Sequence, residues 1–312
     1  MNKRRINAMM AVATAAVIAL LIITVVVDMR SKPESDPTGK FGYINRDGVA
    51  VIEPHYDLAA SFSEGLAAVR IGGKTGYINP AGTMVIEPIW TDGGPFNEGL
   101  AAVSSDGVFG FIDTDGVLVI APRFGRVGRF SGGIALVMED GYYGYINPSG
   151  DYVIKPQYRS ARSFSEGLAP VAVDQQFGYI NTKGDLVIKP TFVRAGDFSN
   201  GYAHVLHGDQ WGFINREGIM TIQPTFDEAR PFADGLSPVR QGTRWGFAGE
   251  DGNIVIAADF FKVKNFTDGV APAKKESDSL YGYIDRQGDW IIAPQFRIAE
   301  PFAENLACVR WP

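Results

Sequence analysis

Few residues of this chain combine the types and the spacing that catalysis or metal binding requires. The chain has three histidines and one cysteine. His204 and His207 stand three residues apart, a spacing that suits a metal pair on a helix. Their segment instead has the pattern of a strand, in which side chains three residues apart point to opposite faces. Cys308 lies in a short apolar segment whose counterparts carry Ala68 and Ala102, so we expect a packed residue rather than a nucleophile.

Two other motifs resemble catalytic ones. Gly73-Lys74-Thr75 matches the end of a phosphate-binding loop, but Ala68 replaces the first glycine of that motif and the context predicts a hairpin. Glu64 and Glu98 would be the carboxylate pair of a hydrolase. Glutamate stands before a turn at this position in four copies of a recurring pattern, which favours a structural role. We therefore predict that the protein is not an enzyme and holds no metal and no cofactor.

A set of arginines is the strongest candidate for a binding site. Asp57 and Asp92 make the equivalent segments acidic early in the chain, whereas the later ones are basic. If the units stack in register, the basic side chains form a stripe suited to an anionic envelope polymer or an acidic partner. Ordinary solvated surface charge is the alternative. The candidates are Arg123, Arg126, Arg129, Arg159, Arg162, Arg194 and Arg230, followed by Lys262 and Lys264.

These residues belong to a pattern that occurs eight times. It consists of an aromatic residue, Gly, a second aromatic residue, Ile, Asn or Asp, two variable positions and Gly. Six of the seven intervals between the marker glycines are 34 residues long and the last is 36. Such a period is typical of repeat architectures. The marker glycines are Gly42, Gly76, Gly110, Gly144, Gly178, Gly212, Gly246 and Gly282.

Each repeat predicts three antiparallel strands. In residues 66–99, the segments 66–70 and 75–79 form a hairpin, and 84–87 is a third strand that ends at Pro88. Asn79-Pro80-Ala81-Gly82 fits a type I turn between the second and third strands. The rest of the repeat is predicted to be a longer connection.

One phenylalanine is present in all eight copies, and we expect its ring to be buried between neighbouring units. A glycine follows three residues later in seven copies, and Asn305 takes its place in the eighth, which predicts a turn with a left-handed backbone. The phenylalanines are Phe62, Phe96, Phe130, Phe164, Phe198, Phe232, Phe266 and Phe302.

The repeat resembles the WG-repeat (KWG-type) family of bacterial proteins over residues 41–310. Trp211-Gly212-Phe213-Ile214-Asn215 and Trp245-Gly246-Phe247 carry the dipeptide that names the family. The seventh copy departs most, with Ala248, Gly249 and Ala258 in place of Ile, Asn and Pro. The resemblance implies β-rich repeats, mostly without known catalytic activity.

The predicted architecture is an all-β repeat protein that forms an elongated β-solenoid or superhelix. A closed, propeller-like toroid is the alternative. Against the toroid, 34 residues and three strands are few for a propeller blade. In its favour, the array begins on the second strand of a unit and ends, at residues 306–310, on a first strand. The last segment would thus complete the first unit.

The amino terminus predicts a membrane anchor. Residues 1–5 form a basic cytoplasmic tip, and residues 6–27 an uncleaved transmembrane helix of sufficient apolar length. Residues 28–40 form a polar linker, and residues 41–312 the repeats. These predictions place a single-pass protein in the membrane with its repeats outside the cytoplasm. Secretion after cleavage of a signal peptide is the alternative.

Charge and composition limit the partners. The 312 residues are 46% hydrophobic with a formal charge of −6, and the residues after position 40 carry −9, which disfavours nucleic acid. We predict a non-catalytic scaffold, anchored in the membrane, that binds a protein or an envelope polymer. The alternative is a cell-wall or glycan-binding module that uses the basic loop stripe or exposed aromatic rings. The rings considered are Trp90, Trp211, Trp245 and Trp290.

Overall fold

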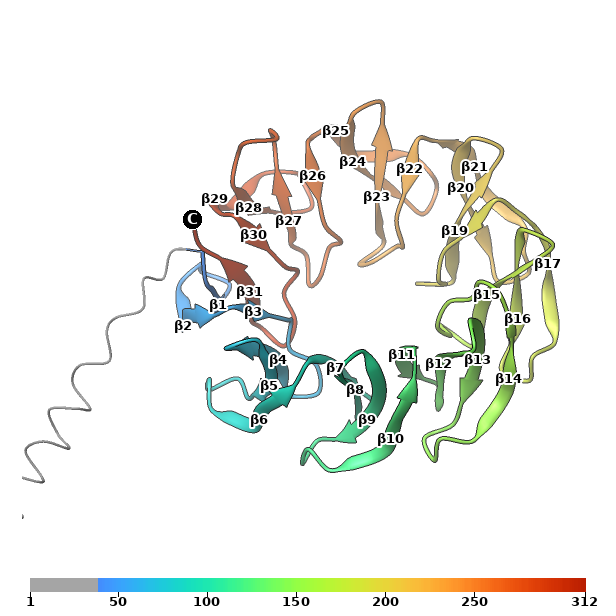
Figure 1. The fold of residues 1–312 in the computed structure, drawn as a ribbon. Helices are drawn as coiled ribbons and strands as arrows, with labels where there is room; N and C mark the ends of the chain where they lie inside the picture. Colours follow the sequence, from blue (N-terminus) through green and yellow to red (C-terminus); the bar gives the residue numbers. More distant parts are fainter. Residues whose placement is uncertain (1–38) are drawn as a thin grey trace, which may run out of the picture. The chain divides into compact units, whose positions relative to one another are not determined.

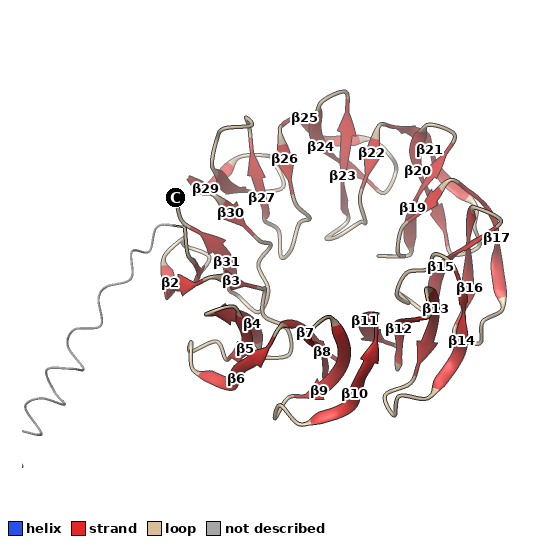
Figure 2. Ribbon diagram, in the orientation of Figure 1, coloured by secondary structure: helices blue, strands red, loops and turns tan. Residues whose placement is uncertain are grey.

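Short antiparallel strands joined by tight turns make up the chain in a computed structural model that describes residues 39–312. The strands form eight sheets, which we call blades I to VIII, arranged in a ring (Figure 1). Strands and loops account for all the described residues, and no helix occurs among residues 39–312 (Figure 2). The all-β prediction is therefore confirmed for this part of the chain.

From the inner strand outward, the strands of each blade are as follows. Blade I combines both ends of the repeat array. Blade I contains β30 (Ile298–Ala299), β31 (Ala307–Arg310), β1 (Phe41–Ile44) and β2 (Ala50–Tyr56). Blade II contains β3 (Leu58–Ala59), β4 (Ala67–Ile71), β5 (Lys74–Ile78) and β6 (Met84–Trp90). Blade III contains β7 (Asp92–Asn97), β8 (Leu100–Ser105), β9 (Val108–Asp113) and β10 (Leu118–Phe124), and blade IV contains β11 (Arg126–Ser131), β12 (Ile134–Glu139), β13 (Tyr142–Ile146) and β14 (Tyr152–Tyr158).

Blades V to VIII follow the same order, except that blade V has three strands. Blade V contains β15 (Leu168–Val173), β16 (Gln176–Asn181) and β17 (Leu186–Phe192), and blade VI contains β18 (Arg194–Ala195), β19 (Tyr202–His207), β20 (Gln210–Asn215) and β21 (Met220–Phe226). Blade VII contains β22 (Glu228–Ala229), β23 (Leu236–Gln241), β24 (Arg244–Gly249) and β25 (Ile254–Phe260), and blade VIII contains β26 (Lys262–Val263), β27 (Ala271–Lys274), β28 (Tyr281–Ile284) and β29 (Trp290–Phe296).

The predicted turns and close backbone approach are present. The amide of Gly82 donates to the carbonyl of Asn79 at 2.9 Å, which closes the turn between β5 and β6. In β16 of blade V, a Cβ on Gly178 would lie 2.4 Å from the carbonyl oxygen of Ile188. No real Cβ tolerates such a contact, so glycine is required where the neighbouring strand crosses. This is the reason for the marker glycine of the repeat.

The inner strand of each blade was not predicted. Residues that the sequence assigned to a connection, such as Asp92–Asn97 in β7, pair with the next strand and complete a fourth strand. In five blades this strand is only two residues long, as in β3 and β18. A blade therefore fits into 34 residues, and the argument that three strands are too few for a propeller was wrong.

The eight phenylalanines are buried between blades, as predicted. Each is at most 3% exposed. Each ring also packs on an aromatic ring from the third strand of the preceding blade; for example, the centroids of Phe198 and Tyr179 lie 4.9 Å apart. The Tyr179 hydroxyl donates to the carbonyl of Gly196 at 2.8 Å, so its polar end is satisfied within the same contact. These contacts join each blade to the next.

The ring closes through a sheet shared by the two ends of the repeat array. β1 pairs with β31 from Phe41–Arg310 to Ile44–Ala307. Blade I thus takes its two outer strands from the start of the array and its two inner strands from the end. The predicted solenoid is wrong, because a solenoid would leave both ends unpaired. The eight blades form a closed β-propeller, as the alternative and the phase of the repeats predicted.

The predicted membrane location is not supported by this structure. Residues 39–312 contain no helix long and apolar enough to cross a membrane. The predicted tip, transmembrane helix and most of the linker fall in residues 1–38, which lie outside the described residues. The single-pass topology with its repeats outside the cytoplasm is therefore withdrawn.

Candidate functional site

The carboxylates considered as a hydrolase pair bind backbone amides. Glu64 accepts hydrogen bonds from the amides of Glu98 and Gly99 in the next blade, at 2.6 and 2.9 Å. Glu98 accepts from Gly132 and Gly133 one blade further, at 2.6 and 2.8 Å. Both glutamates have a φ of 55°, as expected for the left-handed turn that the sequence predicts. Each carboxylate therefore fastens one blade to the next instead of facing the other.

The histidines and the cysteine are not brought together. His207 is exposed, whereas the ring of His204 packs against Gly196 and lies 5.3 Å from the ring of Trp211. Cys308 is fully buried, as predicted, and burial raises the pKa of its thiol. Within residues 39–312 no group of three or more His, Cys, Asp or Glu side chains is arranged to hold a metal ion.

His204 makes stability depend on pH. Its buried Nδ1 has no hydrogen-bond partner among the described residues, and burial lowers its pKa to about 4, with Arg162 and Asp197 as its charged neighbours. Below pH 6.5 the unfolded chain binds a proton that the folded chain excludes, so stability falls as the pH drops toward 4. We expect this residue to account for a loss of up to about 3 kcal/mol of unfolding free energy across that range.

The matched control is His204→Leu, because Leu136 occupies the equivalent place opposite Gly128 in blade IV. Urea unfolding at pH 7 and pH 4.5 should show a smaller loss for the leucine variant than for the wild type. The same loss in both proteins would show that His204 does not titrate as described.

The four tryptophans considered for stacking on sugars contribute to the packing between blades. Trp245 is 5% exposed. Trp90, Trp211 and Trp290 are half-buried, and each packs against the core that joins two blades. They are therefore scaffold residues. They do not support the alternative in which exposed tryptophan rings stack on sugars.

Three of the seven candidate arginines are held by contacts within the chain. Arg162 forms a bidentate pair with Asp197 of the next blade, with N–O distances of 2.7 and 3.2 Å. Arg230 donates to the carbonyl of Val263 at 2.7 Å, and its guanidinium lies 4.0 Å from the centroid of the Trp245 ring. Arg123 is in the outer strand of blade III and donates to the carbonyl of Gly150.

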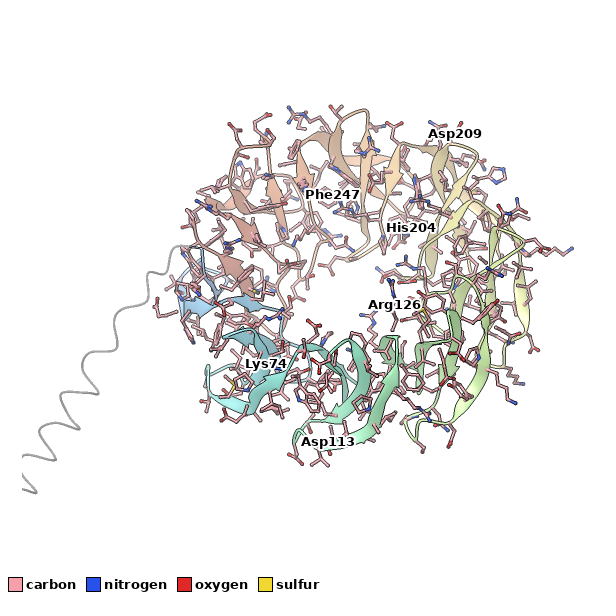
Figure 3. All side chains as sticks on the ribbon, in the orientation of Figure 1. Lys74, Asp113, Arg126, His204, Asp209 and Phe247 are labelled. Carbon is pink, nitrogen blue, oxygen red and sulfur yellow. The ribbon has the colours of Figure 1, made fainter. Side chains whose placement is uncertain are left out.

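The other four arginines define a surface that we call the arginine patch: Arg126, Arg129, Arg159 and Arg194. They are exposed and come from three consecutive blades, on the inner strand or just before it. Figure 3 shows Arg126 at the inner rim of the ring, whereas Asp113 and Asp209 lie toward the periphery. Among residues 39–312, none of the four forms a salt bridge.

Acidic residues at the equivalent positions do have partners. Asp92 lies 3.9 Å from Arg70, and Glu228 lies 3.2 Å from Arg240. Asp57 pairs with Lys40, and this contact lowers the pKa of the Asp57 carboxyl. Three acidic residues at these positions are thus paired with basic side chains, whereas the arginine patch has no carboxylate partner among residues 39–312.

Cavities open between or beside the blades, and three of them bear on the site. One of about 240 Å³ lies between blades II and III, where Thr75 replaces the aromatic residue of the repeat and Gly93 faces it. One of about 600 Å³ lies in blade IV beside Glu139 and Lys155. The largest of these three, of about 810 Å³, lies between the connection that follows β14 and the turn that follows β15. Only this one includes a member of the arginine patch, Arg159.

The cavity of about 810 Å³ was not predicted from the sequence, although a signal was present. The turn that joins β4 to β5 contains glycine, as do its counterparts in blades III, IV, VI and VII, but the turn that joins β15 to β16 in blade V reads Asp174-Gln175. The predictions rest on glycines that the repeats share, whereas the signal is the absence of glycine from this one turn.

The fold defines a closed eight-bladed β-propeller, a class of repeat protein that presents loops from many blades on one surface. Its sequence contains the WG containing repeat eight times in tandem, at residues 41–74, 76–108, 109–143, 143–175, 177–210, 211–242, 245–277 and 281–310. The chain therefore belongs to the WG-repeat family, as the resemblance indicated. A search of curated proteins finds no significant sequence match.

Solved structures share the fold at low sequence identity. A eukaryotic initiation factor is 13% identical with a TM-score of 0.53, over 76% of each chain. The dihydro-heme d1 dehydrogenase NirN is 11% identical with a TM-score of 0.52, over 82% of this chain and 72% of that one. These similarities concern the fold alone, and they include both an initiation factor and an enzyme.

Proposed function

We propose that this propeller is a non-catalytic binding protein that holds an anionic polysaccharide through the arginine patch. The observation that supports the proposal is the imbalance along the inner strands. Asp57, Asp92 and Glu228 at these positions have basic partners, whereas within residues 39–312 the four arginines of blades IV to VI have no acidic partner. Exposed, unpaired guanidinium groups bind carboxylates and sulfates readily, because their planar donors match two acceptor oxygens.

A polymer fits this arrangement better than a small anion. The arginines are spread over three consecutive blades rather than focused on one point. Each contact is individually weak at an exposed site, and several contacts along one chain add up through their linkage. The repeated blade supplies the rigid spacing that this kind of binding needs.

The test is retention of the full chain on immobilised polygalacturonate. We expect the variant Arg126→Gln/Arg129→Gln/Arg194→Gln to bind about tenfold more weakly, since three exposed contacts contribute roughly 0.5 kcal/mol each. Raising the salt concentration should weaken binding of the wild type more than that of the variant.

The matched control changes three exposed lysines outside the patch: Lys74→Gln/Lys183→Gln/Lys189→Gln. It alters the net charge by the same amount and should bind like the wild type. Equal weakening by both triple variants would mean that only net charge matters, and unchanged retention of the patch variant would refute the proposal.

A further inference from the structure

Blade V departs from the repeat at the turn between β15 and β16. Asp174 and Gln175 have φ values of 49° and 69°, the left-handed region that favours glycine. At the position of Gln175, blades II to IV have Gly73, Gly107 and Gly141, and blades VI and VII have a glycine one residue earlier, Gly208 and Gly242. A glutamine is costly in this conformation, and residues kept at such a cost are concentrated at functional sites.

The same turn has lost its connection to the inner part of the blade. In three other blades, the residue before the inner strand accepts a hydrogen bond from this turn. The acceptors are Asp57 for Gly72 at 3.0 Å, Thr91 for Asp106 at 3.3 Å and Asp227 for Gly242 at 2.6 Å. Blade V has Arg159 at this position, and a guanidinium group has no acceptor.

A backbone hydrogen bond between the inner segment and β15 is also missing beside this turn. In the other seven blades the amide of this residue donates to the second strand, as that of Asp57 does to the carbonyl of Arg70 at 2.9 Å. In blade V no such bond from the amide of Arg159 occurs among residues 39–312, and the inner segment is held by the bridge between Ala161 and Val171, in which Ala172 donates to Ser160 and Arg162 donates to Pro170. The missing bond lies at the cavity of about 810 Å³, whose lining includes both Arg159 and Ala172.

The walls of this cavity carry free polar groups and two aromatic rings. Four polar side chains line it and make no side-chain hydrogen bond within residues 39–312: Gln157, Ser160, Asp174 and Gln175. Arg159 contacts only the hydroxyl of Tyr142, at 3.4 Å, and stands 5.6 Å from the centroid of that ring. The rings of Tyr158 and Phe177 are half-buried at the cavity wall.

This combination matches the chemistry of a sugar ring. Hydroxyl groups need both donors and acceptors, which amides, a hydroxyl and a carboxylate provide together. The C–H face of a sugar packs on an aromatic ring. Arg159 and Asp174 have opposite charges, so the cavity selects for hydroxyls rather than for strong charge. Its volume lies within the ~300–1,000 Å³ typical of small-ligand sites.

We propose that the cavity of blade V is a saccharide-binding pocket for one or two sugar units of a glycan. The neighbouring cavity of about 600 Å³ includes Tyr142, the residue that Arg159 contacts, so a chain of sugars has room to continue toward blade IV. The proposal rests on the proposed function only for the nature of the polymer, because the pocket binds a short sugar without Arg126, Arg129 or Arg194.

The test is isothermal titration calorimetry of the full chain with cellobiose, N,N′-diacetylchitobiose and digalacturonate. We expect millimolar or tighter binding of at least one of these disaccharides. Gln175→Gly keeps the turn conformation and removes the amide, so it should weaken that binding at least tenfold without lowering the thermal midpoint. Gln157→Ala should weaken it in the same direction.

The matched control is Asp106→Gly in the corresponding turn of blade III, where the φ of 54° is also left-handed, and this variant should bind like the wild type. Absence of binding for all three disaccharides, or equal binding by the wild type and both pocket variants, would overturn the proposal. The variant Arg126→Gln/Arg129→Gln/Arg194→Gln separates the two proposals. It should lose retention on the polymer and keep the affinity for the disaccharide.

Discussion

Replacement of Phe198 by alanine is expected to lower the free energy of unfolding by about 3–5 kcal/mol. Phe198 has no exposed surface, and its ring packs on Tyr179 at the contact between blades V and VI. Truncation leaves a cavity that the surrounding strands cannot fill, because their hydrogen-bonded ladders fix the distance between the blades. Denaturant unfolding followed by circular dichroism measures the effect.

The control for this substitution is Val187→Ala on the outer strand of blade V, where the side chain is 48% exposed. It should cost less than about 0.5 kcal/mol. Similar losses for the two variants would mean that the phenylalanine is not a packing residue between blades, and the explanation of its eightfold occurrence would fail.

A chain that ends at Glu300 is expected to lose cooperative folding. It lacks β31, the partner of β1 along four residue pairs, and also lacks the buried side chains Phe302 and Leu306. Loss of two large buried side chains already costs roughly 5–10 kcal/mol, comparable to the whole stability of a typical domain. Limited proteolysis and thermal melting should show early cleavage and a broad transition.

A circular permutant provides the control. New ends placed in the turn at residues 182–184, with Pro312 joined to Gly39, keep every strand and every blade contact. The two original ends of the array already lie together, since the amide of Trp311 is 3.4 Å from the carbonyl of Lys40. We expect this protein to fold and melt cooperatively. A truncated chain as stable as the wild type would show that the shared sheet does not hold the ring together.

Most of the blade could be predicted from the sequence, because local rules determine it. Turn residues such as Gly82, the marker glycine Gly178 and the buried Phe198 each have one structural explanation, and the structure confirms all three. The inner strand escaped prediction because it is short and rich in residues that strands disfavour. In blade III, for example, it includes Gly93, Gly94 and Pro95.

The closure of the ring could not be decided from the sequence alone. It depends on the angle between blades, which accumulates over eight copies and is set by packing rather than by any one motif. The candidate site was predicted only in part, because packing between blades also decides which side chains have partners. The arginines were found by their charge, but their neighbours were not, so Arg162 and Arg230 were grouped with free residues although Asp197 and Trp245 hold them.

The sheet that β1 and β31 share in blade I cannot form until the whole repeat array has been synthesised. Arg310 donates to the carbonyl of Gly39, a bond between residues 271 positions apart. At roughly 5–20 residues per second, the first hairpin waits about 15–50 s on the ribosome before its partner is made. During that interval the edge of β1 is open to other chains. Protection of the nascent chain is therefore expected to matter most for this one blade.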